Sequence, residues 1–247
     1  MIKMKDHYLY WSKLGKHNSL FYREEKCLKI LQKFKKNLKF LDVGCGDGLF
    51  LNHLKRQTKF ELYGGDYSIP KVEKCRSKGL NVIKIDLEKK LPFKDNFFDI
   101  VYAGEVIEHL YDPDYAIKEI SRIIKPDGYF LLSTPNLLAW YNRLLFLLGI
   151  KPLFIEMSTI STLVGAGFLK RFIKDPHPVG HIRIFNYDAI RDLLHIYGFN
   201  ILKYKGAIFS PRFSGFFEIL DKLFLMHPKL SSNMIILAQK GKYGLKK

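Results

Sequence analysis

The feature that most constrains the fold is a regular alternation of short β-branched or aromatic runs with helical stretches between residues 38 and 133. The runs typical of strands are Leu38–Val43, Glu61–Gly65, Asn81–Ile85, Phe98–Ala103 and Tyr129–Ser133. The helical stretches between them are Leu49–Gln57, Ile69–Lys78 and Asp114–Ile124. A further helical pattern lies between residues 20 and 36. Because strict alternation requires crossover connections, the sequence predicts a parallel sheet in an α/β domain.

The alternation stops after the fifth run. Residues 137–180 are apolar and basic, and the pattern then resumes before a helix candidate, Phe213–Leu225, and a last strand, Asn233–Gln239. A chain of 247 residues is long enough for one large domain with a well-buried core. We therefore expect residues 1–247 to form a single domain. In it, residues 137–180 are an insertion that serves as a lid or acceptor-binding element, a dimer face, a membrane-surface element or additional core.

The cysteine pattern, the length of the apolar stretch and the net charge indicate where the protein acts and which partners it favours. Cys27, Cys45 and Cys75 show no Cys-x-x-Cys pairing and no signal peptide is evident, so we expect a cytoplasmic protein. The apolar stretch Leu137–Ile150 is interrupted by polar residues and is shorter than the roughly 20 residues that cross a bilayer. The formal charge of +17 favours anionic partners such as nucleic acid or an acidic membrane surface, although a lysine-rich surface alone gives the same excess.

The segment FLDVGCGDG, residues 40–48, joins the first strand to the first helix of the alternation. Glycines at such a junction permit positive φ and allow a ligand to approach the bare backbone, and in a doubly wound sheet this turn lies where ligands bind. The G-x-G-x-G spacing differs from the dinucleotide fingerprint, and no Lys-Ser/Thr pair of a phosphate-binding loop follows. With Asp42 two residues before Gly44, the loop suits a cationic ligand without phosphate.

Two further carboxylates stand where later strands are expected to end. Asp66 follows the second strand and is placed to accept two hydrogen bonds from a ribose diol. Asp86 follows the third strand and can accept a hydrogen bond from an exocyclic adenine amine, with Leu87 lining the ring. The three acids together predict a site for an adenosyl compound.

These residues carry a family resemblance. The segments LDVGCGDG, GGDYS, IDLEKKLPFKDNFFDIVYAGEVIEHL and LLSTPN resemble the successive motifs of class I S-adenosylmethionine-dependent methyltransferases of the type 11/23 kind, over roughly residues 38–136. The resemblance implies a doubly wound, Rossmann-like sheet of seven strands, mostly parallel with the last antiparallel, and helices on both faces. It also implies S-adenosylmethionine as cofactor, with its methionine end at Asp42 and the glycine loop, its ribose at Asp66 and its adenine at Asp86. The expected contacts are Asp42, Gly44, Cys45, Gly46, Gly48, Asp66, Tyr67, Asp86 and Leu87.

Candidate catalytic residues follow the fourth strand. Glu105, Glu108 and His109 have spacings i, i+3 and i+4, which on a helical turn place them on one face. His181, just after the insertion, reaches them if the insertion folds over the pocket. We take His109, His181 and Glu105 as the catalytic candidates without a metal, with the histidines as proton acceptors.

The same four residues carry an alternative with a metal, because two carboxylates and two imidazoles can ligate a divalent ion. The set is similar to that of the small-RNA 3′-terminal 2′-O-methyltransferases, and its first three members are similar to those of the ubiquinone-pathway O-methyltransferases. Either resemblance implies a diol-like acceptor. However, EVIEHL is also common in class I methyltransferases that need no metal, where Glu105 faces the cofactor pocket while Glu108 and His109 serve packing and capping.

The preferred interpretation is O-methylation of a small-molecule, glycan or lipid-linked acceptor. The segments TPN, HIRIF and YGF around the insertion are similar to those of bacterial and archaeal methyltransferases that act in glycan or lipid-linked glycan pathways. The alternatives are a metal-dependent RNA 2′-O-methyltransferase, a dinucleotide-dependent oxidoreductase and a noncatalytic partner subunit. Nucleic acid is the less favoured acceptor, and peripheral contact with a membrane is a further use of the insertion.

Overall fold

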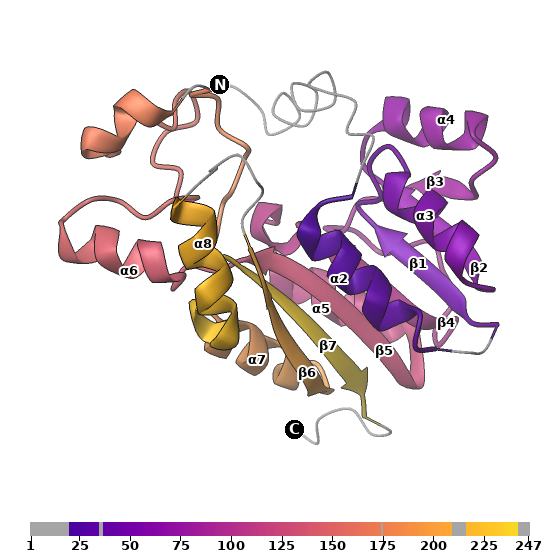
Figure 1. The fold of residues 1–247 in the computed structure, drawn as a ribbon. Helices are drawn as coiled ribbons and strands as arrows, with labels where there is room; N and C mark the ends of the chain where they lie inside the picture. Colours follow the sequence, from indigo (N-terminus) through magenta and orange to yellow (C-terminus); the bar gives the residue numbers. More distant parts are fainter. Residues whose placement is uncertain (1–19, 35–36, 174, 209–215, 242–247) are drawn as a thin grey trace.

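A sheet of seven strands runs through the middle of the molecule, with helices on both faces (Figure 1). The computed structural model describes residues 20–34, 37–173, 175–208 and 216–241. The strands lie in the order β3-β2-β1-β4-β5-β7-β6. Their bounds are β1 Lys39–Val43, β2 Glu61–Asp66, β3 Val82–Lys84, β4 Phe98–Gly104, β5 Ile124–Pro135, β6 Phe199–Ala207 and β7 Asn233–Lys240. Pairs from β3 to β5 are parallel, whereas β7 is antiparallel to β5 and β6, which confirms the expected doubly wound fold.

The helices follow the predicted alternation. The α-helices are α2 Tyr22–Leu31, α3 Leu49–Gln57, α4 Ile69–Ser77, α5 Pro113–Ile123, α6 Trp140–Leu147, α7 Tyr187–Ile196 and α8 Phe216–Leu223. Short 3-10 helices are η1 Ile107–His109, η2 Gly167–Phe172, η3 Phe224–Met226 and η4 Pro228–Leu230. The helix expected at 213–225 is α8 continued by η3, and residues 213–215 lie outside the described part of the chain.

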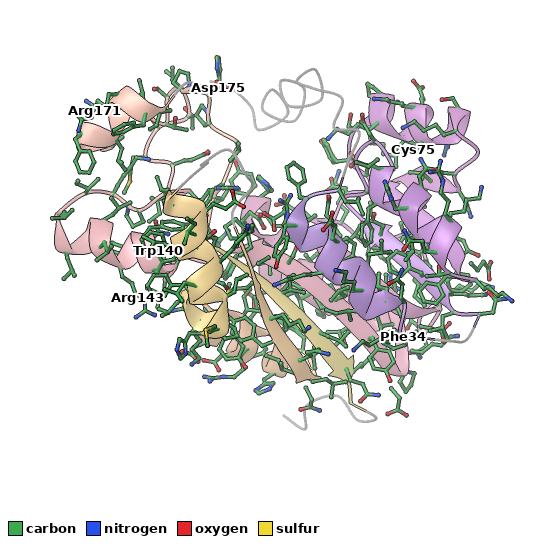
Figure 2. All side chains as sticks on the ribbon, viewed as in Figure 1. Phe34, Cys75, Trp140, Arg143, Arg171 and Asp175 are labelled. Carbon is green, nitrogen blue, oxygen red and sulfur yellow. The ribbon has the colours of Figure 1, made fainter. Side chains whose placement is uncertain are left out.

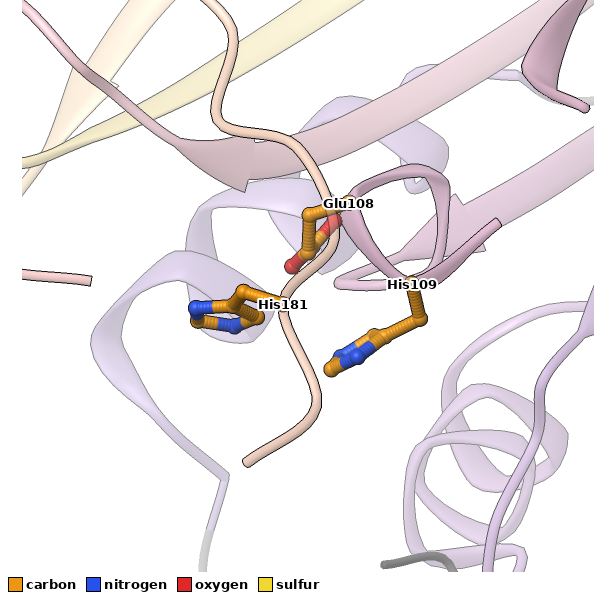
Figure 3. A group of neighbouring side chains, drawn as sticks. All are labelled: Glu108, His109 and His181. Carbon is orange, nitrogen blue, oxygen red and sulfur yellow. The ribbon is translucent and has the colours of Figure 1, made fainter. Parts of the chain in front are cut away.

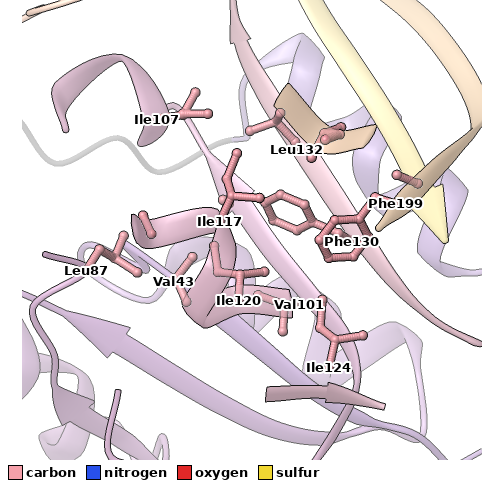
Figure 4. Close-up of a cluster of buried hydrophobic side chains, with 14 of the residues drawn as sticks. Val43, Leu87, Val101, Ile107, Ile117, Ile120, Ile124, Phe130, Leu132 and Phe199 are labelled. Atoms are coloured by element: carbon pink, nitrogen blue, oxygen red, sulfur yellow. The ribbon is translucent and has the colours of Figure 1, made fainter. Parts of the chain in front are cut away.

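The strands contribute side chains to two hydrophobic cores, one on each face of the sheet, because successive side chains of a strand point to opposite faces. In β1, Leu41 and Val43 belong to the core under α5 and α7, whereas Phe40 belongs to the core under α2, α3 and α4. The first of these cores includes the packed rings of Phe130 and Phe199, whose centroids are 5.6 Å apart (Figure 4). The near-continuous apolar runs of the central strands are therefore explained by burial on both faces.

The observed start of β5 differs from the predicted one. It begins at Ile124 rather than Tyr129, because Ile124 pairs with Phe98 before the register shifts. The predicted turn at residues 126–128 lies inside the strand as an irregularity, with Asp127 at φ 63°. A Cβ on Gly128 would lie 2.9 Å from the carbonyl oxygen of Lys125, so only glycine fits there.

The order of strands reverses between β1 and β4, which are neighbours in the sheet although β2 and β3 come between them in sequence. Ligands of doubly wound proteins bind outside the carboxyl ends of the strands at this reversal. The loops that follow β1 and β4, residues 44–48 and 105–109, therefore frame the expected site.

The 137–180 segment carries α6 and η2, and its helix α6 lies beside α8 (Figure 1). Trp140 anchors it: the indole Nε1 donates to Asp221 Oδ1 at 3.1 Å, and the ring stacks on Phe224 with centroids 5.2 Å apart. Within the described ranges, no helix has the length and apolar character needed to cross a membrane.

Candidate functional site

The loop after β1 has the backbone that its glycines predict. Gly44, Gly46 and Gly48 have φ values of 79°, 54° and 74°, a region that side chains with a Cβ rarely adopt. A Cβ on Gly44 would lie 2.5 Å from Val106 Cγ2, so this glycine is required by packing. A Cβ on Gly46 would meet nothing within 4 Å. Gly46 therefore presents bare backbone to open space, as a ligand-binding glycine must.

A cavity beside this loop is rich in carboxylates. Its lining residues are Glu24, Asp42, Gly44, Cys45, Gly46, Asp47, Leu49, Phe50, Tyr102 and Gly104. Asp42 is only 2% exposed, and burial, together with the carboxylates of Glu24 and Asp66, raises its pKa well above the usual range. A buried carboxylate without a cation is unfavourable, so the cavity suits a ligand that carries positive charge. The ammonium and sulfonium of S-adenosylmethionine fit this chemistry.

Asp66, at the end of β2, holds the glycine loop. Its Oδ2 accepts a hydrogen bond from the backbone N–H of Gly46 at 2.9 Å, and its Oδ1 accepts one from Ser68 at 2.8 Å. Carboxylate oxygens can accept further hydrogen bonds, so the ribose contact of Asp66 stays a prediction. The neighbouring Tyr67 ring lies 5.7 Å from Lys84 Nζ and likewise stays a predicted contact.

Asp86 lies just beyond β3, at the same edge of the sheet as Asp42 and Asp66, because β3, β2 and β1 are parallel neighbours. Its Oδ1 accepts from the backbone N–H of Glu88 at 3.1 Å, and Lys89 Nζ is 3.5 Å from Oδ2. Leu87 is buried in the core under α5. Neither residue lines the cavity described above, so their adenine contacts stay predictions.

Helix α2 adds residues that the sequence analysis did not anticipate. Glu24 lines the cavity, and its Oε2 accepts from the backbone N–H of Phe21 at 2.8 Å, which fixes the start of the helix. Arg23 Nε lies 3.5 Å from Glu105 Oε1. The local signal was the acidic pair in the first turn of α2, but only the fold brings that turn to the cavity.

Glu105 corrects the expected arrangement after β4. It has φ 56°, and η1 begins only at Ile107, so Glu105 does not share a helical face with Glu108 and His109. Its Oε1 instead accepts from Ser133 Oγ at 3.2 Å and lies beside Arg23. The prediction of one face for the three residues is therefore wrong, because it assumed a regular helical turn.

Glu108, His109 and His181 do come together (Figure 3). Each offers one ligand atom, and these atoms lie within 4.8 Å of one another. Glu108 is completely buried, and burial with the nearby Glu105 raises its pKa well above the usual range. Its Oε2 accepts from Thr134 Oγ1 at 3.0 Å, whereas its Oε1 has no hydrogen-bond partner among the residues that the structure describes.

The two imidazoles are held by main-chain oxygens. His109 Nδ1 lies 3.0 Å from the carbonyl oxygen of Gly180, and His181 Nδ1 lies 3.1 Å from that of Phe154. Because a carbonyl can only accept, we assign the ring proton to Nδ1 in both, which leaves each Nε2 as an acceptor. The rings are 4.9 Å apart. Burial and the neighbouring His109 lower the pKa of His181 to about 3, so His181 is neutral at ordinary pH.

The loop that carries His181 is anchored by Glu156, another residue that the sequence analysis missed. The carboxylate of Glu156 accepts backbone N–H groups of Val179, Gly180 and His181 at 2.6, 2.8 and 3.0 Å. Phe154, whose carbonyl fixes His181, has φ 73°, which is unusual for a bulky residue. Strained backbone of this kind concentrates at functional sites.

Comparison with known proteins gives a match to a family described as a methyltransferase domain, over residues 14–204. An uncharacterized methyltransferase of Schizosaccharomyces pombe is 33% identical over 47% of this chain and 46% of its own length. A ubiquinone biosynthesis O-methyltransferase of Pelagibacter ubique is 35% identical over 41% of this chain and 43% of its own. A probable tRNA methyltransferase of Bos taurus is 35% identical over 42% and 23%. The chain thus spans less than half the length of these three curated relatives.

Solved structures share the fold along most of the chain. A chain from the Haloferax volcanii complex of the Trm112 methyltransferase activator with a methyltransferase superposes with a TM-score of 0.66 at 16% identity, covering 99% of this chain and 100% of that one. A Thermotoga maritima structure described as an S-adenosylmethionine-dependent methyltransferase superposes with a TM-score of 0.55 at 21% identity, covering 89% of each.

Proposed function

This chain belongs to the methyltransferase domain family of S-adenosylmethionine-dependent enzymes, and on that premise we propose that it methylates a hydroxyl group of a small-molecule, glycan or lipid-linked acceptor. The observation that carries the proposal is the pair of neighbouring imidazoles, His109 and His181, each with Nδ1 at a carbonyl oxygen. A hydroxyl nucleophile must lose its proton, and an imidazole Nε2 is a suitable acceptor.

When bound, S-adenosylmethionine supplies an electrophilic methyl group on a sulfonium. Asp42 and Glu24 face the cavity and balance the positive charge, while Gly46 leaves room for close approach of the ligand to the backbone. Gly104, at the end of β4, lines the same cavity and connects directly to the 105–109 loop. Alignment of the acceptor oxygen with the methyl carbon and sulfur can supply much of the acceleration.

His109 is the proton acceptor in this proposal. In the proposed transfer the acceptor hydroxyl would give its proton to His109 Nε2, while bound S-adenosylmethionine would supply the methyl group and leave as S-adenosylhomocysteine. His181 is a weaker base because its pKa is lowered to about 3, so its role is to orient the acceptor. The neutral state of His181 also avoids repulsion of a protonated His109.

The test uses His109→Gln, which removes the basic nitrogen and keeps a hydrogen-bonding side chain. The variant should bind S-adenosylhomocysteine as the wild type does in calorimetry. It should lose transfer of labelled methyl groups to glycan and lipid-linked glycan fractions by roughly 10²- to 10⁴-fold. Full transfer by the variant, or label on nitrogen rather than oxygen in the product, would contradict the proposal.

A second candidate is a metal-assisted O-methyltransferase, favoured by Glu108 Oε1, which lies beside the two histidines and has no hydrogen-bond partner within the described ranges. One carboxylate and two imidazole nitrogens form a donor set that suits a divalent ion such as Zn²⁺ or Mn²⁺. Glu108, His109 and His181 would hold the ion, which would acidify the acceptor hydroxyl. Glu105 is not part of this set, since it lies against Arg23.

Elemental analysis separates the two candidates. A stoichiometric metal that disappears in Glu108→Gln and in His181→Ala supports the second candidate, and activity that survives complete chelation excludes it.

RNA is the alternative acceptor, supported by the net charge and by the probable tRNA methyltransferase among the relatives. Methylation of RNA, with binding that weakens steeply as salt rises, would replace the glycan acceptor by RNA.

A further inference from the structure

The outer face of α6 carries apolar side chains that are exposed in the described part of the chain. Trp140, Tyr141 and Leu145 are buried, Trp140 and Tyr141 in a small cluster beside α8. On the outside, Leu147 and Leu148 are 83% and 65% exposed. Among the residues that the structure describes, helix α6 is therefore apolar on two sides, one packed beside α8 and the other exposed.

Helix η2, in the same segment of the chain, also exposes aromatic and basic side chains. Phe168 and Phe172 are exposed, and the guanidinium of Arg171 lies 5.9 and 5.0 Å from their ring centroids. Helices α6 and η2 both project from the same end of the molecule, away from the sheet, with Arg143 and Arg171 at that end (Figures 1 and 2). We call Leu144, Leu147, Leu148, Phe168 and Phe172, with Arg143, Lys170 and Arg171, the α6–η2 surface.

Basic residues outnumber acidic ones in the segment that carries this surface, although the exposed Asp175 follows it. Residues 137–173 contain four basic residues and Glu156 as their one acid. The carboxylate of Glu156 is engaged by three backbone N–H groups of the 179–181 loop. The α6–η2 surface therefore combines exposed apolar side chains with three basic ones, on a chain of net charge +17.

We propose that the α6–η2 surface docks on a lipid bilayer that contains anionic headgroups. Leucine and phenylalanine side chains gain free energy when they enter the boundary between headgroups and acyl chains, and arginine and lysine are attracted to anionic lipid. A second copy of the chain would bring two positive surfaces together, which disfavours self-association through this face. The inference does not depend on the proposed reaction, because docking requires neither cofactor nor acceptor.

The experiment is cosedimentation of the full chain with vesicles of phosphatidylcholine alone or mixed with phosphatidylglycerol. The wild type should bind the mixed vesicles and bind the neutral ones much more weakly. Leu147→Glu with Leu148→Glu should weaken binding to mixed vesicles on the order of tenfold or more. Lys170→Glu with Arg171→Glu should weaken it by about fivefold for each reversed charge.

The matched control is Ile196→Glu with Leu202→Glu, which places the same charges at exposed apolar positions of α7 and β6. It should bind as the wild type does, and all variants should keep their thermal midpoint and their S-adenosylhomocysteine affinity. The proposal is overturned if the wild type ignores mixed vesicles, or if the control loses as much binding as the α6 variant. A dimer in sedimentation velocity that Leu147→Glu with Leu148→Glu dissociates would assign the surface to a second copy instead.

Discussion

The glycine loop after β1 and the pair formed by His109, which follows β4, and His181 are built differently. The loop owes its shape to backbone conformation within residues 42–48, held by Asp66. The histidine pair depends on carbonyl groups and a carboxylate supplied by residues 154–180, far along the chain. The proposed cofactor site can therefore be predicted from a local sequence pattern, whereas the proposed acceptor side depends on two main-chain carbonyls and a carboxylate that only the tertiary structure brings to the histidines.

The largest effect is expected for Asp42→Asn, which removes a buried carboxylate next to the glycine loop. Affinity for S-adenosylhomocysteine in calorimetry should fall roughly 10- to 100-fold, since a charged hydrogen bond is lost. Asp192→Asn is the matched control, because the carboxylate of Asp192 is exposed, pairs with Arg191 and lies on α7, outside the cavity lining. Equal losses in both variants would show that Asp42 has no special part in cofactor binding.

Glu156→Ala should disturb the loop that carries His181 and leave the glycine loop after β1 unchanged. Loss of a carboxylate that accepts three backbone N–H groups should lower the free energy of unfolding by about 2 kcal/mol in urea titrations. Cofactor affinity should remain within about twofold, because the 179–181 loop does not line the cavity. Glu218→Ala, which removes a surface pair with Lys222, is the control and should change stability by less than about 0.5 kcal/mol. A large loss of cofactor affinity in Glu156→Ala would mean that the two regions are coupled.

Gly46→Ala measures how much the loop depends on bare backbone. The methyl group should reduce cofactor affinity about tenfold, and the positive φ should lower stability by about 1 kcal/mol. Gly79→Ala is the matched control, since Gly79 has φ 70° and equally open space around its absent Cβ, but lies after α4 outside the cavity lining. It should lose the same stability with unchanged affinity. The idea fails if both variants bind the cofactor equally well.

The smallest expected effect is the pH dependence of cofactor affinity. The pKa of Asp42 is raised by burial and by Glu24 in the free protein, and a bound cation favours the carboxylate. Binding should therefore release a proton, and affinity should fall as the pH drops below that raised pKa and level off above it. Calorimetry across pH should show a few-fold change in the wild type and a flat profile in Asp42→Asn. A sloping profile in the variant would assign the proton to another group.

The same contrast explains what could be predicted from the sequence. The strands and α-helices from β1 to α5 lie within one residue of their predicted bounds, whereas β5 begins five residues earlier and ends two residues later than predicted. The loop and its acids were predictable because strand ends and glycine conformations are local properties. The early start of β5 was not, because a pairing with Phe98 overrides the Pro-Asp-Gly turn signal.

The candidate site was predictable only in part. His109 and His181 meet as expected, but Glu105 does not join them, because its left-handed backbone directs it to Arg23 and Ser133. Glu24 and Glu156 reach the site region through packing of α2 and folding of the insertion, and no sequence spacing relates them to the loop or the histidines. Contacts between distant segments are decided by tertiary structure, which a pattern read along the chain does not contain.

The position of β7 has a consequence for how the protein is made. Strand β7 lies between β5 and β6 and pairs with both. Strand β6 therefore cannot join the sheet until residues 233–240 have left the ribosome. During synthesis β6 has no neighbour in the finished sheet, and both flanks of the gap expose unpaired backbone edges. Removal of residues 233–240 would separate β6 from β5 inside the sheet, whereas removal of an edge strand would leave the other strands paired.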